Sequence, residues 1–264
     1  MSDAFYKKKI IFEKPNYTKL INQGYVCVDM HYHSTFSDGA ATINEIVKKL
    51  KDLKIGISLT DHNEIKGVFE LNKVIEKNNL FLVPGIEVKS QENIDILFYF
   101  YNISELKKFF EQEIIKNRIN YFHSTKTKIN LVKLLKLKDN YKCITSVAHP
   151  YGYNLRAKKN LFNEFREILL KFPNIEVING GNNREDNIKA INLARKNKKG
   201  FTSGSDGHSI YSLGKTITCA KAKNLKEFLD SIKNKKNFVI GTETDFGKYG
   251  EYIRFGFNKI KNLF

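Results

Sequence analysis

Residues 26–53 read VCVDMHYHSTFSDGAATINEIVKKLKDL and contain the first strand-to-helix unit of the chain. The apolar run at 26–30 predicts a buried strand. Thr42, followed three residues later by Glu45, is typical of a helix N-terminus in which the two residues cap each other. A helix from there to about Leu53 leads directly to a second apolar run at 55–59. This order of strand, helix and strand is the beginning of a βαβ pattern.

The same alternation continues along most of the chain. We expect strands at 26–30, 55–59, 80–83, 94–100, 143–148, 175–178, 200–203, 216–220 and 238–240. We expect helices at 42–53, 64–78, 129–137, 161–172, 184–197 and 225–232, and one more that is capped by Ser104. Alternating elements predict parallel strands with helices outside them, and roughly seven or eight such units have the size of a barrel. We therefore predict a single α/β domain over 1–264, with its core at about 26–216 and a C-terminal extension at 217–264.

The composition excludes several classes of protein. The chain has 264 residues, and its 41% hydrophobic content with 20 Phe and 13 Tyr excludes a disordered chain. No apolar run reaches the roughly 20 residues of a membrane span, and residues 1–11 do not resemble a signal peptide. Cys27, Cys143 and Cys219 lie in apolar runs without a pairing pattern. We therefore expect buried free thiols, a reducing compartment, a cytoplasmic location and no membrane partner.

The net charge of +17, from 45 Lys and Arg against 28 Asp and Glu, admits more than one explanation. A basic surface is typical of a protein that binds nucleic acid or another polyanion. An AT-rich genome would also enrich Lys, which accounts for 39 of the 45 basic residues. Because Arg is the better bidentate reader of phosphates and bases, the presence of only 6 Arg weakens the case for sequence-specific DNA binding.

Five of the six histidines follow a predicted strand or lie in the loop after one, and they are His31, His33, His62, His149 and His208. The sixth, His123, lies in a polar stretch and is expected at the surface. The carboxyl ends of the strands of a parallel barrel converge on one face, so these histidines should meet there. Two residues at i and i+2 of an extended chain point to the same side, so His31 and His33 could bind one cation. Imidazoles with nearby carboxylates predict a site for Zn, Mn or Fe.

The order and spacing of five motifs resemble the PHP superfamily, named for polymerase and histidinol phosphatase. The matching segments are DMHYHS with SDG (29–39), LTDHN (59–63), PGIE (84–87), AHP (148–150) and GSDGH (204–208). The resemblance implies a distorted (β/α)7 TIM-like barrel, two or three divalent metal ions and the hydrolysis of phosphoesters.

The resemblance also implies which residues bind the metal ions. One ion would bind His31, His33, Glu87 and Asp206, and a second would bind Asp38, His62 and His208. A third, in trinuclear members, would bind Glu87, His149 and a histidine at the position where this chain has Asp95. Asp95 could bind a hard ion such as Mn or Mg, leave the third ion weakly held, or leave the centre with two ions.

Other charged residues have two possible roles each. Asp29 and Asp61 could accept an N–H of a ligating histidine, or they could simply be carboxylates at strand ends. Arg184 and Arg156 could bind a substrate phosphate, or Arg184 could be an ordinary helix-surface residue.

The sequence therefore predicts a metal-dependent phosphoesterase that acts on a small phosphorylated metabolite or a nucleotide. The attacking group would be a metal-activated hydroxide, with His208 as the one side chain that could also act directly. An exonuclease or oligonucleotide phosphatase is the first alternative, and a non-catalytic PHP module is the second. A further alternative is a barrel of the amidohydrolase type that hydrolyses a C–N bond. It shares the opening H-x-H but lacks the late Asp-x-His pair, so it explains less of the sequence.

Overall fold

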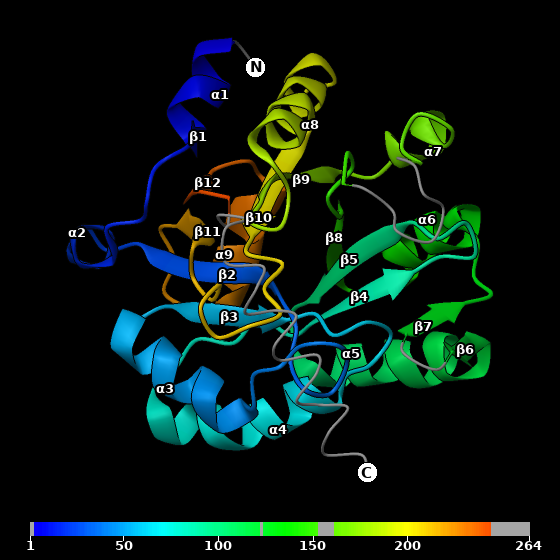
Figure 1. The fold of residues 1–264 in the computed structure, drawn as a ribbon, viewed down its shortest axis with the longest axis horizontal. Helices are drawn as coiled ribbons and strands as arrows, with labels where there is room; N and C mark the ends of the chain where they lie inside the picture. Colours follow the sequence, from blue (N-terminus) through cyan, green and yellow to red (C-terminus); the bar gives the residue numbers. More distant parts are fainter. Residues whose placement is uncertain (1–2, 122–123, 153–160, 244–264) are drawn as a thin grey trace.

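The computed structural model describes residues 3–121, 124–152 and 161–243, which form two five-stranded sheets and a hairpin (Figure 1). The first sheet has the order β1-β12-β11-β2-β3, with strands Ile10–Ile11 (β1), Phe238–Gly241 (β12), Thr216–Ala220 (β11), Val26–Tyr32 (β2) and Gly56–Leu59 (β3). The second has the order β10-β9-β8-β5-β4, with strands Gly200–Gly204 (β10), Asn174–Asn179 (β9), Cys143–Val147 (β8), Asp95–Phe100 (β5) and Gly85–Lys89 (β4). Arg118–Tyr121 (β6) and Ser124–Thr127 (β7) form the hairpin.

Helices surround the sheets, with α3 and α4 beside β3 and α8 near β9 (Figure 1). The α-helices are Asp3–Lys9 (α1), Tyr17–Asn22 (α2), Ile43–Leu53 (α3), Lys66–Ile75 (α4), Ile103–Phe109 (α5), Leu131–Asn140 (α6), Arg166–Leu169 (α7), Arg184–Lys196 (α8) and Leu225–Lys233 (α9). Short 3₁₀ or π turns follow α4 and α5 at Glu76–Asn78 (η1), Phe110–Ile114 (η2) and Ile115–Asn117 (η3). Thr42 and Glu45 form the predicted reciprocal cap of α3.

The prediction of parallel strands is correct for some strand pairs and wrong for others. The pairs β1–β12, β2–β3, β8–β9 and β9–β10 are parallel. The pairs β2–β11, β11–β12, β4–β5 and β5–β8 are antiparallel. The reason is clearest at β4–β5, which only residues 90–94 connect. A parallel pair needs a crossover of about a dozen residues, so this short connection requires an antiparallel pair.

Most predicted elements differ from the structure by a few residues at their ends, and three differ more. Residues 80–83 do not form the expected strand: Leu82 makes only a single bridge to Ile57, and β4 begins at Gly85. The helix expected over 161–172 is reduced to the four residues of α7. The helix expected from Ser104 begins after Asn102, because the Asn102 side chain accepts the backbone N–H of Glu105 at 2.8 Å. The elements α1, β1, α2, β6 and β7 were not predicted.

The two sheets approach each other at the ends of β2, β3, β4 and β10. The N–H of His33 donates to the carbonyl of Gly207 at 3.0 Å, and that of Asp206 donates to the carbonyl of His31 at 2.8 Å. On the other side, the N–H of Asn63 donates to the carbonyl of Glu87 at 2.9 Å. These bonds place residues that follow strands of both sheets along one edge. The closed seven-unit barrel stays a prediction.

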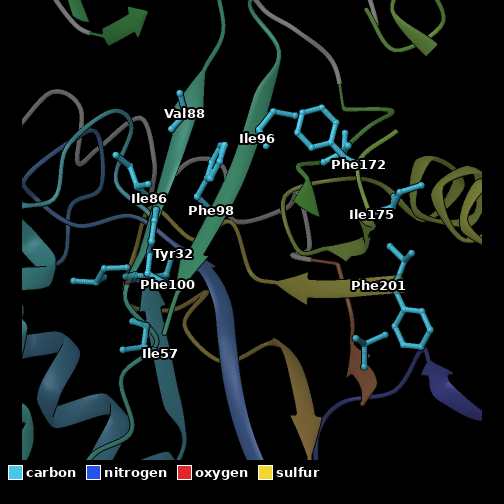
Figure 2. Packing of buried hydrophobic residues seen from close by; sticks show 14 of the residues in the cluster. Tyr32, Ile57, Ile86, Val88, Ile96, Phe98, Phe100, Phe172, Ile175 and Phe201 are labelled. Carbon is cyan, nitrogen blue, oxygen red and sulfur yellow. The ribbon is translucent and has the colours of Figure 1, made fainter. Parts of the chain in front are cut away.

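Alternation along β4 and β5 separates the hydrophobic core from this edge. The core cluster includes Ile86 and Val88 of β4 together with Ile96, Phe98 and Phe100 of β5 (Figure 2). Because successive side chains of a strand point to opposite faces, Glu87 and Lys89 lie on the other face of β4. The burial of the apolar residues therefore determines where these two charged side chains are placed.

The prediction of unpaired cysteines is wrong for one pair. Cys27 of β2 and Cys219 of β11 form a disulfide, and the two residues are direct partners in the antiparallel ladder. They are 192 residues apart in the sequence, so no spacing pattern indicates the pairing. Cys143 is a free thiol, as expected. The cytoplasmic location stays a prediction.

None of the helices in the described part of the chain has the length and apolar character that a membrane span requires. The described part of the predicted C-terminal extension contributes strands to the first sheet, since β12 lies between β1 and β11. Residues 244–264 lie outside the described residues.

Candidate metal centre

The strand ends bring all the predicted metal ligands together. They fall into overlapping groups in which the ligand atoms lie within 4.8 Å of one another. The groups are His31, His33 and Glu87; His31, His149 and Asp206; His33, Asp38, His62 and His208; and His62, Glu87 and Asp95.

His31, His33, Glu87 and Asp206 form the most compact arrangement. Nε2 of His31 lies 3.2 Å from Nε2 of His33, 3.3 Å from Oε1 of Glu87 and 3.4 Å from Oδ1 of Asp206. Nε2 of His33 lies 3.2 Å from the same oxygen of Asp206 and 3.4 Å from Oε2 of Glu87. Four ligands at ordinary zinc distances around one tetrahedral ion are about 3.3–3.4 Å apart. The spacing of these four side chains therefore suits a single ion.

Glu87 connects the groups, because each of its oxygens lies near two imidazoles. Oε1 is 3.3 Å from Nε2 of His31 and 3.1 Å from Nε2 of His149. Oε2 is 3.4 Å from Nε2 of His33 and 2.9 Å from Nδ1 of His62. The carboxylate is fully buried, so it is well placed to bridge two cations.

Asp38 organises the more exposed side of the centre. Its Oδ2 lies 3.5 Å from Nε2 of His62 and 3.3 Å from Nε2 of His208, and its Oδ1 lies 3.6 Å from Nδ1 of His33. The Asp38 side chain is 38% exposed, whereas Glu87 is not exposed at all. The centre is therefore open to solvent on the Asp38 side.

Several buried ligand atoms lack hydrogen bonds, which tests whether the residues fit a metal ion. Nδ1 of His33, Nδ1 of His62 and Oε2 of Glu87 make no hydrogen bond within the described residues. The last two atoms are nevertheless only 2.9 Å apart. Buried polar atoms without partners are costly, and a shared cation would satisfy an imidazole lone pair and a carboxylate together. The donor set and its spacing therefore fit divalent metal ions.

Glu176 and Asn179 of β9 support the centre and were not predicted. Oε1 of Glu176 lies 3.0 Å from Nδ1 of His31, and its Oε2 accepts the backbone N–H of His149 at 2.9 Å. The Asn179 amide donates to Glu176 at 2.8 Å and to Oδ2 of Asp206 at 3.1 Å. A carboxylate that contacts the far nitrogen of a ligating imidazole fixes the orientation of its ring. The available signal was a single charge inside the apolar run IEVI at 175–178.

Asp29 and Asp61 hold the loops that carry the ligands. Asp29 accepts the backbone N–H groups of His31, Ser205 and Gly214 at 3.4, 2.8 and 2.9 Å. Burial raises the pKa of Asp29 to about 6, although these hydrogen bonds oppose the shift. Asp61 accepts the N–H and hydroxyl of Ser34 at 2.8 and 2.7 Å. Among the hydrogen bonds of the described residues, neither carboxylate contacts a histidine ring.

The structure does not bring Arg184 into the cluster. Its Nε donates to Glu243 at 2.9 Å, and its guanidinium lies 4.1 Å from the centre of the Phe12 ring. Arg156 and His123 lie outside the described residues.

The carboxylates keep several imidazoles of the metal-free centre protonated. Burial lowers the pKa of His31, but the charges of Asp206, Glu176 and Glu87 outweigh it and raise the pKa well above its ordinary value. Burial is likewise outweighed at His149, where Glu87 raises the pKa to about 9. At His208 the contact with Asp38 raises the pKa to about 10. A metal ion would therefore have to displace protons from this centre.

The opposite shifts occur at the carboxylates. Burial alone would raise the pKa of Glu87, but the charges of His62 and His31 hold it well below its ordinary value. Asp38 and Asp206 have strongly lowered pKa values for the same reason. Their oxygens are therefore ionised at neutral pH and available as ligands.

The chain belongs to the PHP domain family, whose model matches residues 29–240. An uncharacterized protein of Methanocaldococcus jannaschii is 23% identical over 244 residues, which cover 88% of this chain and 90% of that protein.

Among the solved structures that share the fold are two that each cover more than four fifths of this chain. One is a two-domain protein of Bacteroides vulgatus described as containing a PHP-like metal-dependent phosphoesterase, with a TM-score of 0.59 and 16% identity, covering 88% of this chain and 68% of that one. The other is a lesion-specific endonuclease of Pyrococcus furiosus, with a TM-score of 0.62 and 16% identity, covering 81% of this chain and 57% of that one. At these identities the similarity concerns the fold alone.

Proposed function

We propose that this protein is a metal-dependent phosphoesterase that hydrolyses a phosphate ester of a small metabolite or a nucleotide. The observation that carries the proposal is the position of Glu87, a buried carboxylate within 3.4 Å of nitrogen atoms of four imidazoles. A buried carboxylate whose two oxygens each lie near two imidazoles could serve as a ligand to more than one ion. Membership of the PHP family supports the same reaction class.

We propose that two sets of side chains hold the ions. His31, His33, Glu87 and Asp206 would hold the deeper ion, and Asp38, His62 and His208 would hold the ion nearer to solvent. Bound divalent ions would supply Lewis acidity for a water molecule and positive charge for the phosphate oxygens. Zn, Mn and Fe all accept this mixture of imidazole and carboxylate ligands.

The other residues of the centre would orient and shield these ligands. Oε1 of Glu176 contacts Nδ1 of His31 at 3.0 Å and so orients its ring, and the Asn179 amide donates a hydrogen bond to Asp206. His208 is 30% exposed, so its ring could also contact a substrate. The closed (β/α)7 barrel, as one domain around this centre, would place all the ligand-bearing loops on one face.

Activity on a panel of phosphate esters would test the proposal. The panel would contain nitrophenyl phosphate, its bis-ester, histidinol phosphate, mononucleotides and a nucleoside 3′,5′-bisphosphate, each with Mn or Zn. We expect turnover by the wild type, loss of metal and turnover in Glu87→Gln, and no change in Glu70→Gln, which alters an exposed surface pair with Lys73. If the metal-loaded protein hydrolyses none of the esters in the panel, the proposal is refuted.

An exonuclease or oligonucleotide phosphatase is the second candidate. The charge of +17 favours it, and so does the fold shared with an endonuclease. A long polyanion releases many counterions on binding, so kcat/KM should fall steeply with salt for an oligonucleotide and only slightly for a small monoester. If metal binds and neither class of ester is hydrolysed, the non-catalytic PHP module would be favoured.

A further inference from the structure

Lys89 and Asp95 form a charged pair inside the candidate metal centre. They are direct partners in the antiparallel ladder of β4 and β5. Lys89 follows Glu87 by two residues, so the two side chains lie on the same face of β4. Asp95 belongs to the group of possible metal ligands that also contains His62 and Glu87.

The contact between these two side chains is short and buried. Nζ of Lys89 lies 2.5 Å from Oδ2 of Asp95, and the two side chains are only 13% and 6% exposed. The carboxylate of Asp95 also lies within 4.8 Å of ligand atoms of His62 and Glu87. The ammonium of Lys89 is therefore a cation that the chain itself provides to Oδ2 of Asp95. Oδ1 of Asp95 makes no hydrogen bond within the described residues, so this oxygen is available to an additional ion once the ammonium is removed.

The charges of the centre support this assignment. Five carboxylates contact its imidazoles or Lys89, and they are Asp38, Glu87, Asp95, Glu176 and Asp206. With neutral imidazoles, two divalent ions together with one ammonium balance these five negative charges. A third divalent ion would leave an excess positive charge and would lie beside the ammonium, which repels it.

We propose that Lys89 is a resident cation of the centre, whose pairing with Asp95 takes the place of a third metal ion, so that the centre binds two ions. This inference rests on the proposed metal centre and assigns roles to two residues within it. Asp95 is then a partner of Lys89 and binds no metal. Removal of the Lys89 ammonium leaves the Asp95 carboxylate, which lies next to Glu87 and His62, free to bind an additional ion.

The experiment is a measurement of metal stoichiometry. Each variant is equilibrated with saturating Mn, and the bound ions per chain are counted by native mass spectrometry and by elemental analysis. We expect two ions in the wild type and three in Lys89→Met. We expect two in Asp95→Asn, in the double variant Lys89→Met/Asp95→Asn, in the conservative Lys89→Arg and in Lys66→Met, whose side chain is 72% exposed.

The outcomes separate this inference from the proposed function. Three ions in the wild type would overturn the inference alone, and this result does not depend on whether any variant folds. A folded Lys89→Met protein with only two ions would overturn it as well, because Lys89 would then not exclude an ion. A wild type that binds no metal at all would refute the proposed function itself.

Discussion

Metal binding should release protons, because the metal-free centre holds protons on imidazoles that must be free to act as ligands. The pKa of about 10 for His208 determines the count. At pH 7.5 more than about 99% of this ring carries a proton, so about one proton per chain should leave it on saturation, and His31, whose pKa is also raised well above its ordinary value, adds to the count. At pH 10 His208 should release only about half a proton.

The assay is calorimetric titration with Mn in two buffers that differ in ionisation enthalpy. The slope of the observed enthalpy against the buffer enthalpy gives the number of protons released. His208→Gln should reduce the count by about one at pH 7.5, and Glu70→Gln, at the surface, should leave it unchanged. A slope of zero at pH 7.5 with metal bound would refute the reasoning, because the imidazoles would then be neutral in the metal-free centre.

Three further perturbations test the site and its support. Replacing Glu176 by Gln should weaken metal binding by about 10- to 100-fold, since His31 loses the carboxylate that orients its ring; a competition titration with a chelating dye would measure this. In Gly204→Ala the new Cβ would lie 2.3 Å from the backbone nitrogen of His31, so urea unfolding should show a loss of at least about 2 kcal/mol. In the metal-free protein, the free energy of unfolding should fall as the pH rises from about 6.5 through about 9 and 10. The raised pKa values of His149 and His208 add stability only while both rings are protonated. Thermal unfolding measured against pH would test this, and a flat profile over this range would contradict it.

Local signals predicted the parts of the fold that depend on neighbouring residues. The cap of α3 needs only Thr42 and Glu45, and the structure has it as expected. His31 and His33 converge to 3.2 Å because their spacing of two residues is a property of extended chain.

Features that depend on pairing between distant segments were missed. In the sequence Glu176 has no feature that separates it from an ordinary strand residue. Its contact with His31 exists only because β9 pairs with β8 and β10 in the second sheet. The Cys27–Cys219 disulfide depends on the pairing of β2 with β11. The contact of Lys89 with Asp95 likewise depends on the antiparallel register of β4 and β5, which the expectation of parallel strands concealed.

The register of β4 also explains how a centre with so many buried ionisable groups keeps its shape without metal. Ile86 and Val88 face the hydrophobic core, whereas Glu87 and Lys89 face the centre, and a slip by one residue would exchange the two faces. Burial of each such apolar side chain stabilises the fold by about 1.5–3 kcal/mol. Burial of Glu87 next to imidazoles costs free energy unless protons or metal ions balance its charge. The apolar face of the strand therefore holds Glu87 and Lys89 in place at the centre.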